Sequence, residues 1–189
     1  MPRFGHGGSA LNLHPMRILA ICGSLRAGSS NTALLQAAAR VAPPQMEIVL
    51  YEGLRDLPHF DPGLDGEHDL APPAVAALRA QISAADGLII SSPEYAHGVP
   101  GSLKNALDWL VSWPDFAGKP VLLWNASAAG GAHAQASLVE TLRTMSARVL
   151  VEDSLLAPFL PKKLMPGAEL PSEAARAVRS SLEAFARMG

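Results

Sequence analysis

Short apolar runs alternate along the chain with longer segments rich in helix-forming residues. The runs are five or six residues long, and their nearly continuous apolar character is typical of strands covered on both faces. We predict strands at Arg17–Cys22, Met46–Tyr51, Gly87–Ser91, Val121–Asn125 and Arg148–Glu152. We predict helices at Asn31–Val41, Pro72–Ala84, Ser102–Ser112, Ala132–Ser146 and Ser172–Met188.

This alternation of strand and helix predicts a parallel sheet with right-handed crossovers. Five strands with helices on both faces favour an α/β fold, a doubly wound three-layer α/β/α sheet in the flavodoxin-like order 2-1-3-4-5. Ligands of such sheets bind beyond the carboxyl ends of the strands, near the switch in strand order. The loops after the first, third and fourth strands are therefore the predicted site. The irregular segment Glu52–Ala71 is either a functional loop or an unrecognised element.

Composition narrows the class of protein. The 189 residues fit one domain, and 15 basic against 17 acidic residues give a net charge of −2, which argues against a nucleic-acid partner bound by bulk charge. No apolar run reaches the ~18 residues of a membrane span. A single cysteine allows neither a disulfide framework nor a cysteine-rich metal site, so we expect a cytoplasmic protein without a metal. We interpret residues 1–15 as a disordered extension before a domain at 16–189.

The loop after the first strand has the composition of a phosphate cradle. Residues 23–32 hold two glycines, four hydroxyl side chains, an asparagine and the guanidinium of Arg26, and they lead into a helix N-terminus. No lysine completes a Walker motif, Leu25 interrupts the dinucleotide fingerprint, and Gly28 stands where a Cys-x5-Arg phosphatase loop needs arginine. This leaves a site for a terminal monophosphate such as that of flavin mononucleotide (FMN). The alternative is a capped helix after a polar turn. Cys22 is interpreted as a small core residue.

The loop after the third strand is rigid, with two prolines and two glycines in residues 93–101. A rigid backbone can present N–H groups at fixed points to the edge of a flat heterocycle. The two loops carry the motifs GSLRxGSxN and SPEYxxGxPGxLKNALDW. With these motifs the chain resembles the NADPH-dependent FMN reductase family, which includes quinone, chromate and azo-dye reductases on a flavodoxin-like fold. The resemblance covers about residues 16–152, and it departs from the family at Ala96-His97, where asparagine usually follows the tyrosine.

The resemblance implies a set of cofactor-binding residues, matched position by position. The FMN phosphate would be held by Ser24, Arg26, Ser29, Ser30, Asn31 and Thr32. The isoalloxazine ring would be lined, largely by backbone atoms, by Pro93, Glu94, Tyr95, Ala96, His97 and Gly98. The loop after the fourth strand would close over the ring, and its best matches are Ser127, Gly130 and Gly131. The alternatives are a solvated carboxylate for Glu94, an exposed loop histidine for His97 and a simple helix-start turn for the two glycines.

The function implied is hydride transfer from NADPH, or NADH, to bound FMN and then to a quinone, azo compound, metal oxyanion or free flavin. The flavin carries the chemistry, so no catalytic side chain is expected, and the kinetics would be ping-pong. The family also implies a homodimer or homotetramer. Two other functions stay open: a flavodoxin-type electron carrier and a flavin-binding redox sensor. The low aromatic content, 5%, favours a flavin with one open face and therefore a reductase.

Overall fold

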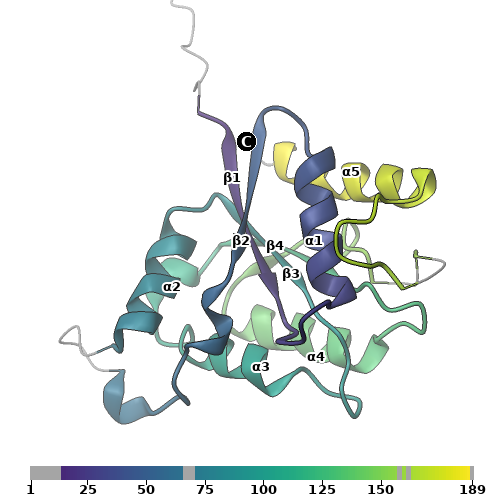
Figure 1. Cartoon of the computed structure of the whole chain (residues 1–189). Coiled ribbons are helices and arrows are strands. Elements are labelled where there is room, and N and C mark those ends of the chain that lie inside the picture. The colour runs from purple at the N-terminus through teal and green to yellow at the C-terminus, as the bar shows by residue number, and fades with distance from the viewer. Residues whose placement is uncertain (1–13, 66–70, 157–158, 161–162, 188–189) are drawn as a thin grey trace, which may run out of the picture.

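A parallel five-stranded sheet forms the centre of the molecule, in the order β2-β1-β3-β4-β5 (Figure 1). This confirms the predicted fold class and strand order. The computed structural model describes residues 14–65, 71–156, 159–160 and 163–187, so the predicted extension at residues 1–15 lies almost wholly outside the described residues. The strands are β1 (Met16–Cys22), β2 (Met46–Tyr51), β3 (Gly87–Ser91), β4 (Pro120–Trp124) and β5 (Arg148–Val149).

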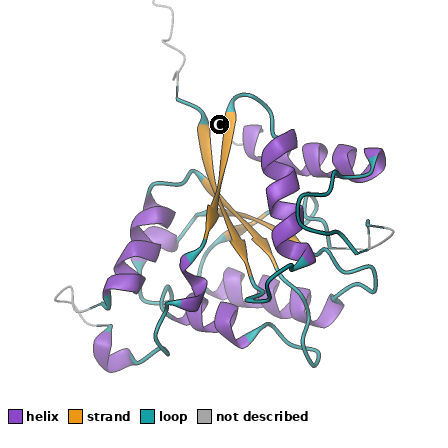
Figure 2. Ribbon diagram, viewed as in Figure 1, coloured by secondary structure: helices purple, strands orange, loops and turns teal. Residues whose placement is uncertain are grey.

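Helices cover both faces of the sheet and complete the three layers (Figure 2). One face carries α1 (Ser30–Val41) and α5 (Ser172–Ala186). The other carries α2 (Pro73–Ser83), α3 (Gly101–Asp108) and α4 (Ala132–Thr144). Most boundaries fall within one or two residues of the predicted ones, because capping and proline signals fix helix starts well.

The sheet builds one hydrophobic core on each of its faces. Along β1, Leu19 and Ile21 belong to the core under α2 and α3, whereas Ile18 and Ala20 belong to the core under α1 and α5. Every residue of β3 is buried, and Ile89 is 0% exposed. Because successive side chains point to opposite faces, a strand covered on both faces becomes apolar throughout.

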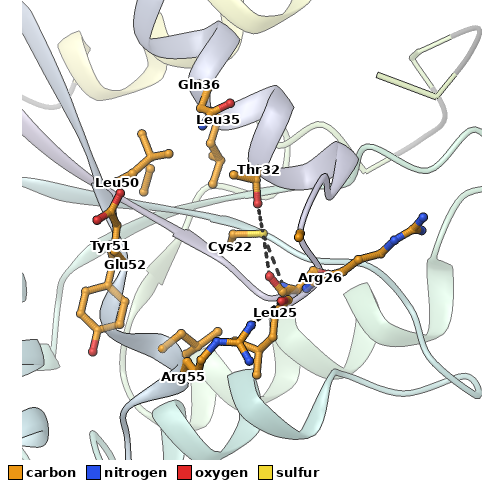
Figure 3. Close-up of a pocket in the computed structure, with 14 residues that line it drawn as sticks. Cys22, Leu25, Arg26, Thr32, Leu35, Gln36, Leu50, Tyr51, Glu52 and Arg55 are labelled. Carbon is orange, nitrogen blue, oxygen red and sulfur yellow. Dashed lines mark hydrogen bonds between the residues drawn. The ribbon is translucent and has the colours of Figure 1, made fainter. Parts of the chain in front are cut away.

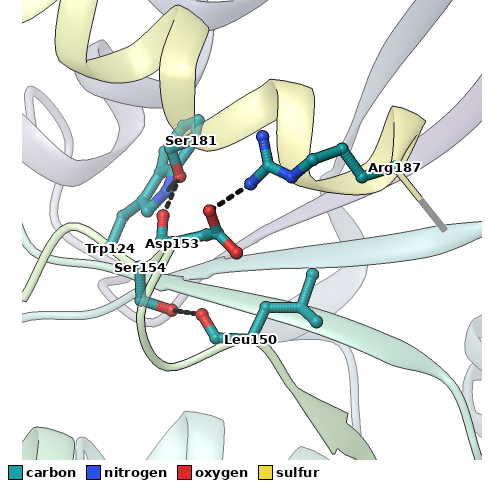
Figure 4. A network of polar contacts seen from close by, with 6 residues as sticks. All are labelled: Trp124, Leu150, Asp153, Ser154, Ser181 and Arg187. Atoms are coloured by element: carbon teal, nitrogen blue, oxygen red, sulfur yellow. Dashed lines mark hydrogen bonds and ion pairs between the residues drawn. The ribbon is translucent and has the colours of Figure 1, made fainter.

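The edge strand β5 is shorter than predicted, and a serine hydroxyl explains why. We expected Arg148–Glu152, but the strand ends at Val149 and the chain loops outward. The hydroxyl of Ser154 accepts the N–H of Leu123 at 3.0 Å. It also donates to the carbonyl of Leu150 at 2.7 Å (Figure 4). The side chain thus replaces a backbone partner of β4, and regular pairing resumes only at Leu155, which forms a bridge with Trp124.

The loop excursion after β5 is fixed to α5 by polar contacts (Figure 4). The indole Nε1 of Trp124 donates to the Ser181 hydroxyl at 2.9 Å, and that hydroxyl donates in turn to the carbonyl of Asp153. The Asp153 carboxylate forms an ion pair with Arg187 at the end of α5. The edge of the sheet is therefore closed by side chains rather than by a longer strand.

The helix α3 ends at Asp108, four residues before the predicted Ser112. The indole of Trp109 is fully buried and donates to the carbonyl of Pro58 at 2.9 Å, so the chain turns inward at this point. Asn105 contacts the same segment twice, because its Nδ2 donates to the Pro58 carbonyl at 2.9 Å and its Oδ1 accepts the N–H of Phe60 at 2.8 Å. These contacts hold the segment that we predicted as irregular.

That segment, 52–71, is an ordered connection where the structure describes it. It contains two short 3-10 helices, Gly53–Arg55 and Pro62–Leu64, and Phe60 packs edge-on against Trp109 with ring centroids 5.0 Å apart. Arg79 of α2 forms an ion pair with Asp65 at 2.7 Å. Across the described residues, no helix is long and apolar enough to cross a membrane.

Replacing Ile89 with alanine tests the importance of the central strand. We expect Ile89→Ala to lower the free energy of unfolding by about 2–5 kcal/mol, because the side chain leaves a cavity under packed helices. The control is Val111→Ala, since Val111 is 61% exposed and its loss should change stability by less than about 0.5 kcal/mol. Urea unfolding of both variants measures the difference, and equal losses would contradict the assignment of Ile89 to the core.

Candidate functional site

The loops after β1, β3 and β4 meet at the carboxyl edge of the sheet and enclose a cavity of about 280 Å³. The strand ends are level there, because Cys22 pairs with Ser91 and Ser91 pairs with Trp124. We call this space the front cavity. Its lining residues are Ser24, Arg26, Ser29, Ser30, Asn31, Pro93, Tyr95, Ala126, Ser127, Ala128 and Lys163. The structure therefore brings together predicted residues from all three loops.

Asn31 joins the three loops through a single buried oxygen. Its Oδ1 accepts the hydroxyl of Ser91 at 2.8 Å and the backbone N–H of Ala126 at 3.1 Å. Asn31 lies in the first turn of α1, and only 5% of it is exposed. The helix that follows β1 is thus bonded to the end of β3 and to the loop after β4.

The first loop is shaped by its own side chains. Ser29 caps α1, because its hydroxyl accepts the N–H of Asn31 at 3.2 Å. The hydroxyl of Ser24 accepts the N–H of Arg26 at 3.3 Å and lies 3.2 Å from the Tyr95 hydroxyl across the cavity. Position 23 requires glycine because the loop passes close to Ser92 there. A Cβ at this position would lie 2.6 Å from the hydroxyl oxygen of Ser92.

Cys22 has a role that the sequence did not reveal. Its sulfur accepts the hydroxyl of Thr32 at 3.1 Å and the N–H of Ser24 at 3.4 Å, and it lies 3.9 Å from the Ser29 hydroxyl. As predicted, Cys22 packs against the core, where it is half-buried, and its sulfur in addition holds the first loop. The hydroxyl of Thr32 is used in this contact. Thr32 is therefore the one residue predicted to hold the phosphate that does not line the front cavity.

The loop after β3 makes a tight two-residue turn. Tyr95 and Gly98 exchange backbone hydrogen bonds of 3.0 and 2.9 Å, and the residues between them have positive φ, 49° for Ala96 and 60° for His97. Left-handed backbone is rare without glycine, and it persists only where the surroundings enforce it. Here the His97 ring packs on the ring of His133, with centroids 4.2 Å apart. The strained turn is thereby fixed to the start of α4.

Glu94 points away from the front cavity and caps α4. Its Oε2 accepts the N–H of Ala134 at 2.9 Å. That hydrogen bond is the main reason why the pKa of Glu94 lies below its usual value. Burial is the next largest influence and opposes it, and the nearby His133 and His97 lower the pKa further. Glu94, Ala96, His97 and Gly98 do not line the front cavity. They attach this loop to its neighbour.

The loop after β4 contains a buried donor without a partner. Asn125 Oδ1 accepts the N–H of Ser127 at 2.8 Å, whereas Asn125 Nδ2 has no hydrogen-bond partner among the described residues. Gly131 packs against it, and a Cβ there would lie 2.1 Å from Nδ2. This buried donor faces the turn at Gly131 and does not line the front cavity. Gly130 and Gly131 line the turn into α4 and lie outside the front cavity.

Lys163 is a cavity residue that sequence reasoning missed. It follows β5 by a long irregular segment, it is exposed, and it contributes to the lining of the front cavity. The sequence did not point to Lys163, because no motif surrounds it and it lies far along the chain from the other lining residues. Its presence adds a second cation to the cavity.

The hydroxyls, the unpaired N–H groups at the start of α1 and two cations suit a phosphate ester at the switch point of a doubly wound sheet. Fold and site together define a mononucleotide-binding protein of the flavodoxin-like class. The sequence profile of the NADPH-dependent FMN reductase family matches residues 16–160, and the chain belongs to that family. It is therefore an oxidoreductase of a family that uses FMN and NAD(P)H.

Individual relatives agree with this assignment. The quinone reductase of Escherichia coli K12 is 37% identical over 155 residues, which are 80% of this chain and 82% of that protein. The NAD(P)H-dependent FMN reductase PA1204 of Pseudomonas aeruginosa is 42% identical over 132 residues, 67% of this chain and 69% of its own. Among solved structures, the flavoenzyme NAD(P)H:(acceptor) oxidoreductase FerB of Paracoccus denitrificans superposes with a TM-score of 0.74 at 25% identity and covers 91% of this chain and 96% of its own.

The capping role of Glu94 predicts a pH-dependent contact. Because the pKa of Glu94 is lowered on folding, its contact with Ala134 is fully present above the carboxyl's unfolded pKa and is lost as the pH falls through the lower folded value. The NMR shift of the Ala134 amide should therefore titrate in acid. In Glu94→Gln the amide oxygen still accepts but cannot titrate, so the shift should stay constant, and in Glu94→Ala the amide should lose hydrogen-exchange protection. Full protection in Glu94→Ala would exclude the cap.

Proposed function

We propose that this chain is an FMN-dependent NAD(P)H oxidoreductase that takes hydride from NADPH and passes the electrons to a small-molecule acceptor. The front cavity carries the proposal, because it gathers hydroxyl side chains and Arg26 around the N-terminus of α1. The acceptor is a quinone, an azo compound, a metal oxyanion or free flavin. The name of one relative, a quinone reductase, supports a quinone as acceptor, and the name of another, an NAD(P)H-dependent FMN reductase, supports a flavin.

The phosphate end of FMN would be held by the first loop. The hydroxyls of Ser24 and Ser30 line the front cavity, and the start of α1 adds partial positive charge. Arg26 supplies a fork of donors suited to phosphate oxygens, and Lys163 supplies a point charge. Asn31 would act through the loops that it joins, since its carboxamide oxygen is already used.

The ring end would lie between the loops after β3 and β4. When bound, FMN supplies the hydride acceptor and electron donor that no side chain of this chain provides. Pro93 and Tyr95 line the cavity from one loop and residues 126–128 line it from the other. The second group consists only of small side chains, so it leaves one side of the ring accessible. Donor and acceptor would therefore use the same open face in turn, which gives ping-pong kinetics.

The quaternary structure and cellular location are part of the same proposal. The protein would form a homodimer or homotetramer, and its one free cysteine suits the reducing cytoplasm. Cross-linking and sedimentation of the FMN-loaded protein measure the assembly. A monomer at micromolar concentration would contradict it.

Replacing Arg26 tests the phosphate site. We expect Arg26→Ala to weaken FMN binding by about 1.5–3 kcal/mol, because a charge-assisted hydrogen bond to phosphate is lost. Quenching of FMN fluorescence during titration of the apoprotein measures this. Riboflavin, which has no phosphate, should bind the variant and the wild type equally. Arg143→Ala, a change of an exposed arginine on α4, is the control. Unchanged FMN affinity in Arg26→Ala would exclude Arg26 from the phosphate site.

Steady-state kinetics test the reaction. The FMN-loaded protein should oxidise NADPH with benzoquinone as acceptor, and double-reciprocal plots at several quinone concentrations should be parallel. Intersecting lines would contradict the alternation of substrates on one face. A protein that binds FMN but does not oxidise NADPH would be an electron carrier instead.

A further inference from the structure

The turn that carries Arg26 is held by polar contacts rather than by packing. Residues 25–28 are exposed, and Leu25, Arg26 and Ala27 line a cavity of about 280 Å³ between α1 and β2 (Figure 3). This part of the first loop is therefore not packed tightly against the sheet or the helix. The direction of the Arg26 side chain depends on how the peptide groups on either side of it are fixed.

The peptide between Leu25 and Arg26 is held at both ends. Its carbonyl oxygen, on Leu25, accepts a hydrogen bond from Nη2 of Arg55 at 2.7 Å. Its N–H, on Arg26, donates to the Ser24 hydroxyl at 3.3 Å. Because the C=O and N–H of a trans peptide lie in one plane and point in opposite directions, the two contacts together fix that plane. The carbonyl of Arg26 in turn accepts the N–H of Ser29 at 3.2 Å, so the backbone of Arg26 is bonded on both sides.

Arg55 reaches Leu25 from an anchored segment. It ends the 3-10 helix that follows β2, and the N–H of Asp56 closes this turn on the carbonyl of Gly53 at 3.0 Å. The neighbouring Leu54 belongs to the hydrophobic core and is 6% exposed. In the part of the chain that the structure describes, the Arg55 guanidinium forms no ion pair, so no carboxylate competes with the Leu25 carbonyl for it.

The two arginines point to different sides of the turn. Figure 3 shows the Arg55 guanidinium at the Leu25 carbonyl and the Arg26 side chain extending away from Arg55. Arg26 lines the front cavity, whereas Arg55 does not. Arg55 is therefore placed to act on a ligand of the front cavity through the backbone that carries Arg26, and not by contact with the ligand.

We propose that Arg55 is a positioning residue of the phosphate site. By holding the Leu25 carbonyl, it fixes the point from which the Arg26 side chain enters the front cavity. Without that bond the exposed peptide can rotate, and the phosphate must order the loop as it binds. Order that exists before binding does not have to be imposed by the ligand, which is how preorganisation raises affinity. The inference rests on the proposed function, because it takes the ligand of Arg26 to be the FMN phosphate.

Flavin titrations of the full chain, freed of flavin, test the role of Arg55. We expect Arg55→Ala to weaken FMN binding about fivefold, as the loss of one hydrogen bond of ordinary net strength would. Riboflavin binding should not change, because riboflavin has no phosphate for Arg26 to hold. Arg55→Lys keeps a cationic donor for the Leu25 carbonyl, so it should restore FMN affinity to within about twofold of the wild type. Arg143→Ala, a change of an exposed arginine on α4, is the control.

A double-mutant cycle separates positioning from a direct effect of charge. If Arg55 acts through Arg26, the change Arg55→Ala should weaken FMN binding by less than about twofold when Arg26→Ala is already present. A full fivefold loss in that background would overturn the proposal, because Arg55 would then act on the phosphate through its own charge. Equal losses for riboflavin and FMN in Arg55→Ala would overturn it as a general disturbance of the site, as would an unchanged FMN affinity.

The NMR order parameter of the Arg26 amide gives a readout that needs no flavin. In Arg55→Ala we expect it to fall from the range of rigid backbone, about 0.85, toward the flexible range below about 0.6. An unchanged order parameter would overturn the proposal. Failure of the wild type to bind either flavin would instead overturn the proposed function, and the order parameter would still decide whether Arg55 holds the loop.

Discussion

The site depends on one buried oxygen, Oδ1 of Asn31. Two of its neighbours, the Ser91 hydroxyl and the Ala126 N–H, come from other loops, and in a buried place each would cost about 1–3 kcal/mol if left without a partner. The contact therefore fixes how far the start of α1 stands from the ends of β3 and β4. The width of the front cavity follows from that distance, because its walls are these three segments.

The other polar side chains divide into those that anchor loops and those that remain free. Cys22 and Thr32 hold the first loop from behind, and Glu94 with the two packed imidazoles holds the loop after β3 to α4. Their polar atoms are used in these contacts, so the cavity is faced by other groups, among them serine hydroxyls, Arg26 and Lys163. A site built in this way is suited to a phosphate-bearing ligand by its shape and charge.

Sequence reasoning reached the architecture and the three loops but not the direction of individual side chains. The strands β2 and β3 were predicted to the residue, because each is a short apolar run bounded by turn residues. The shortness of β5 could not be predicted, since it depends on the hydroxyl of Ser154 meeting β4 in space. In the same way, tertiary contacts decide that Thr32 faces a sulfur, that Glu94 caps a helix and that Lys163 reaches the cavity. The positive φ of Ala96 and His97 contradicts local preference, as happens where surrounding structure dictates a functional loop.

The contact between Ser24 and Tyr95 also has a consequence for biosynthesis. The two residues are 71 positions apart, and the contact from Asn31 to Ala126 spans 95. During translation the first loop emerges early, but its contacts with Tyr95 and Ala126 form only after the loops that follow β3 and β4 have been made. The three loops of the front cavity are therefore complete only after about two thirds of the chain has been made, so we expect flavin binding to follow that point.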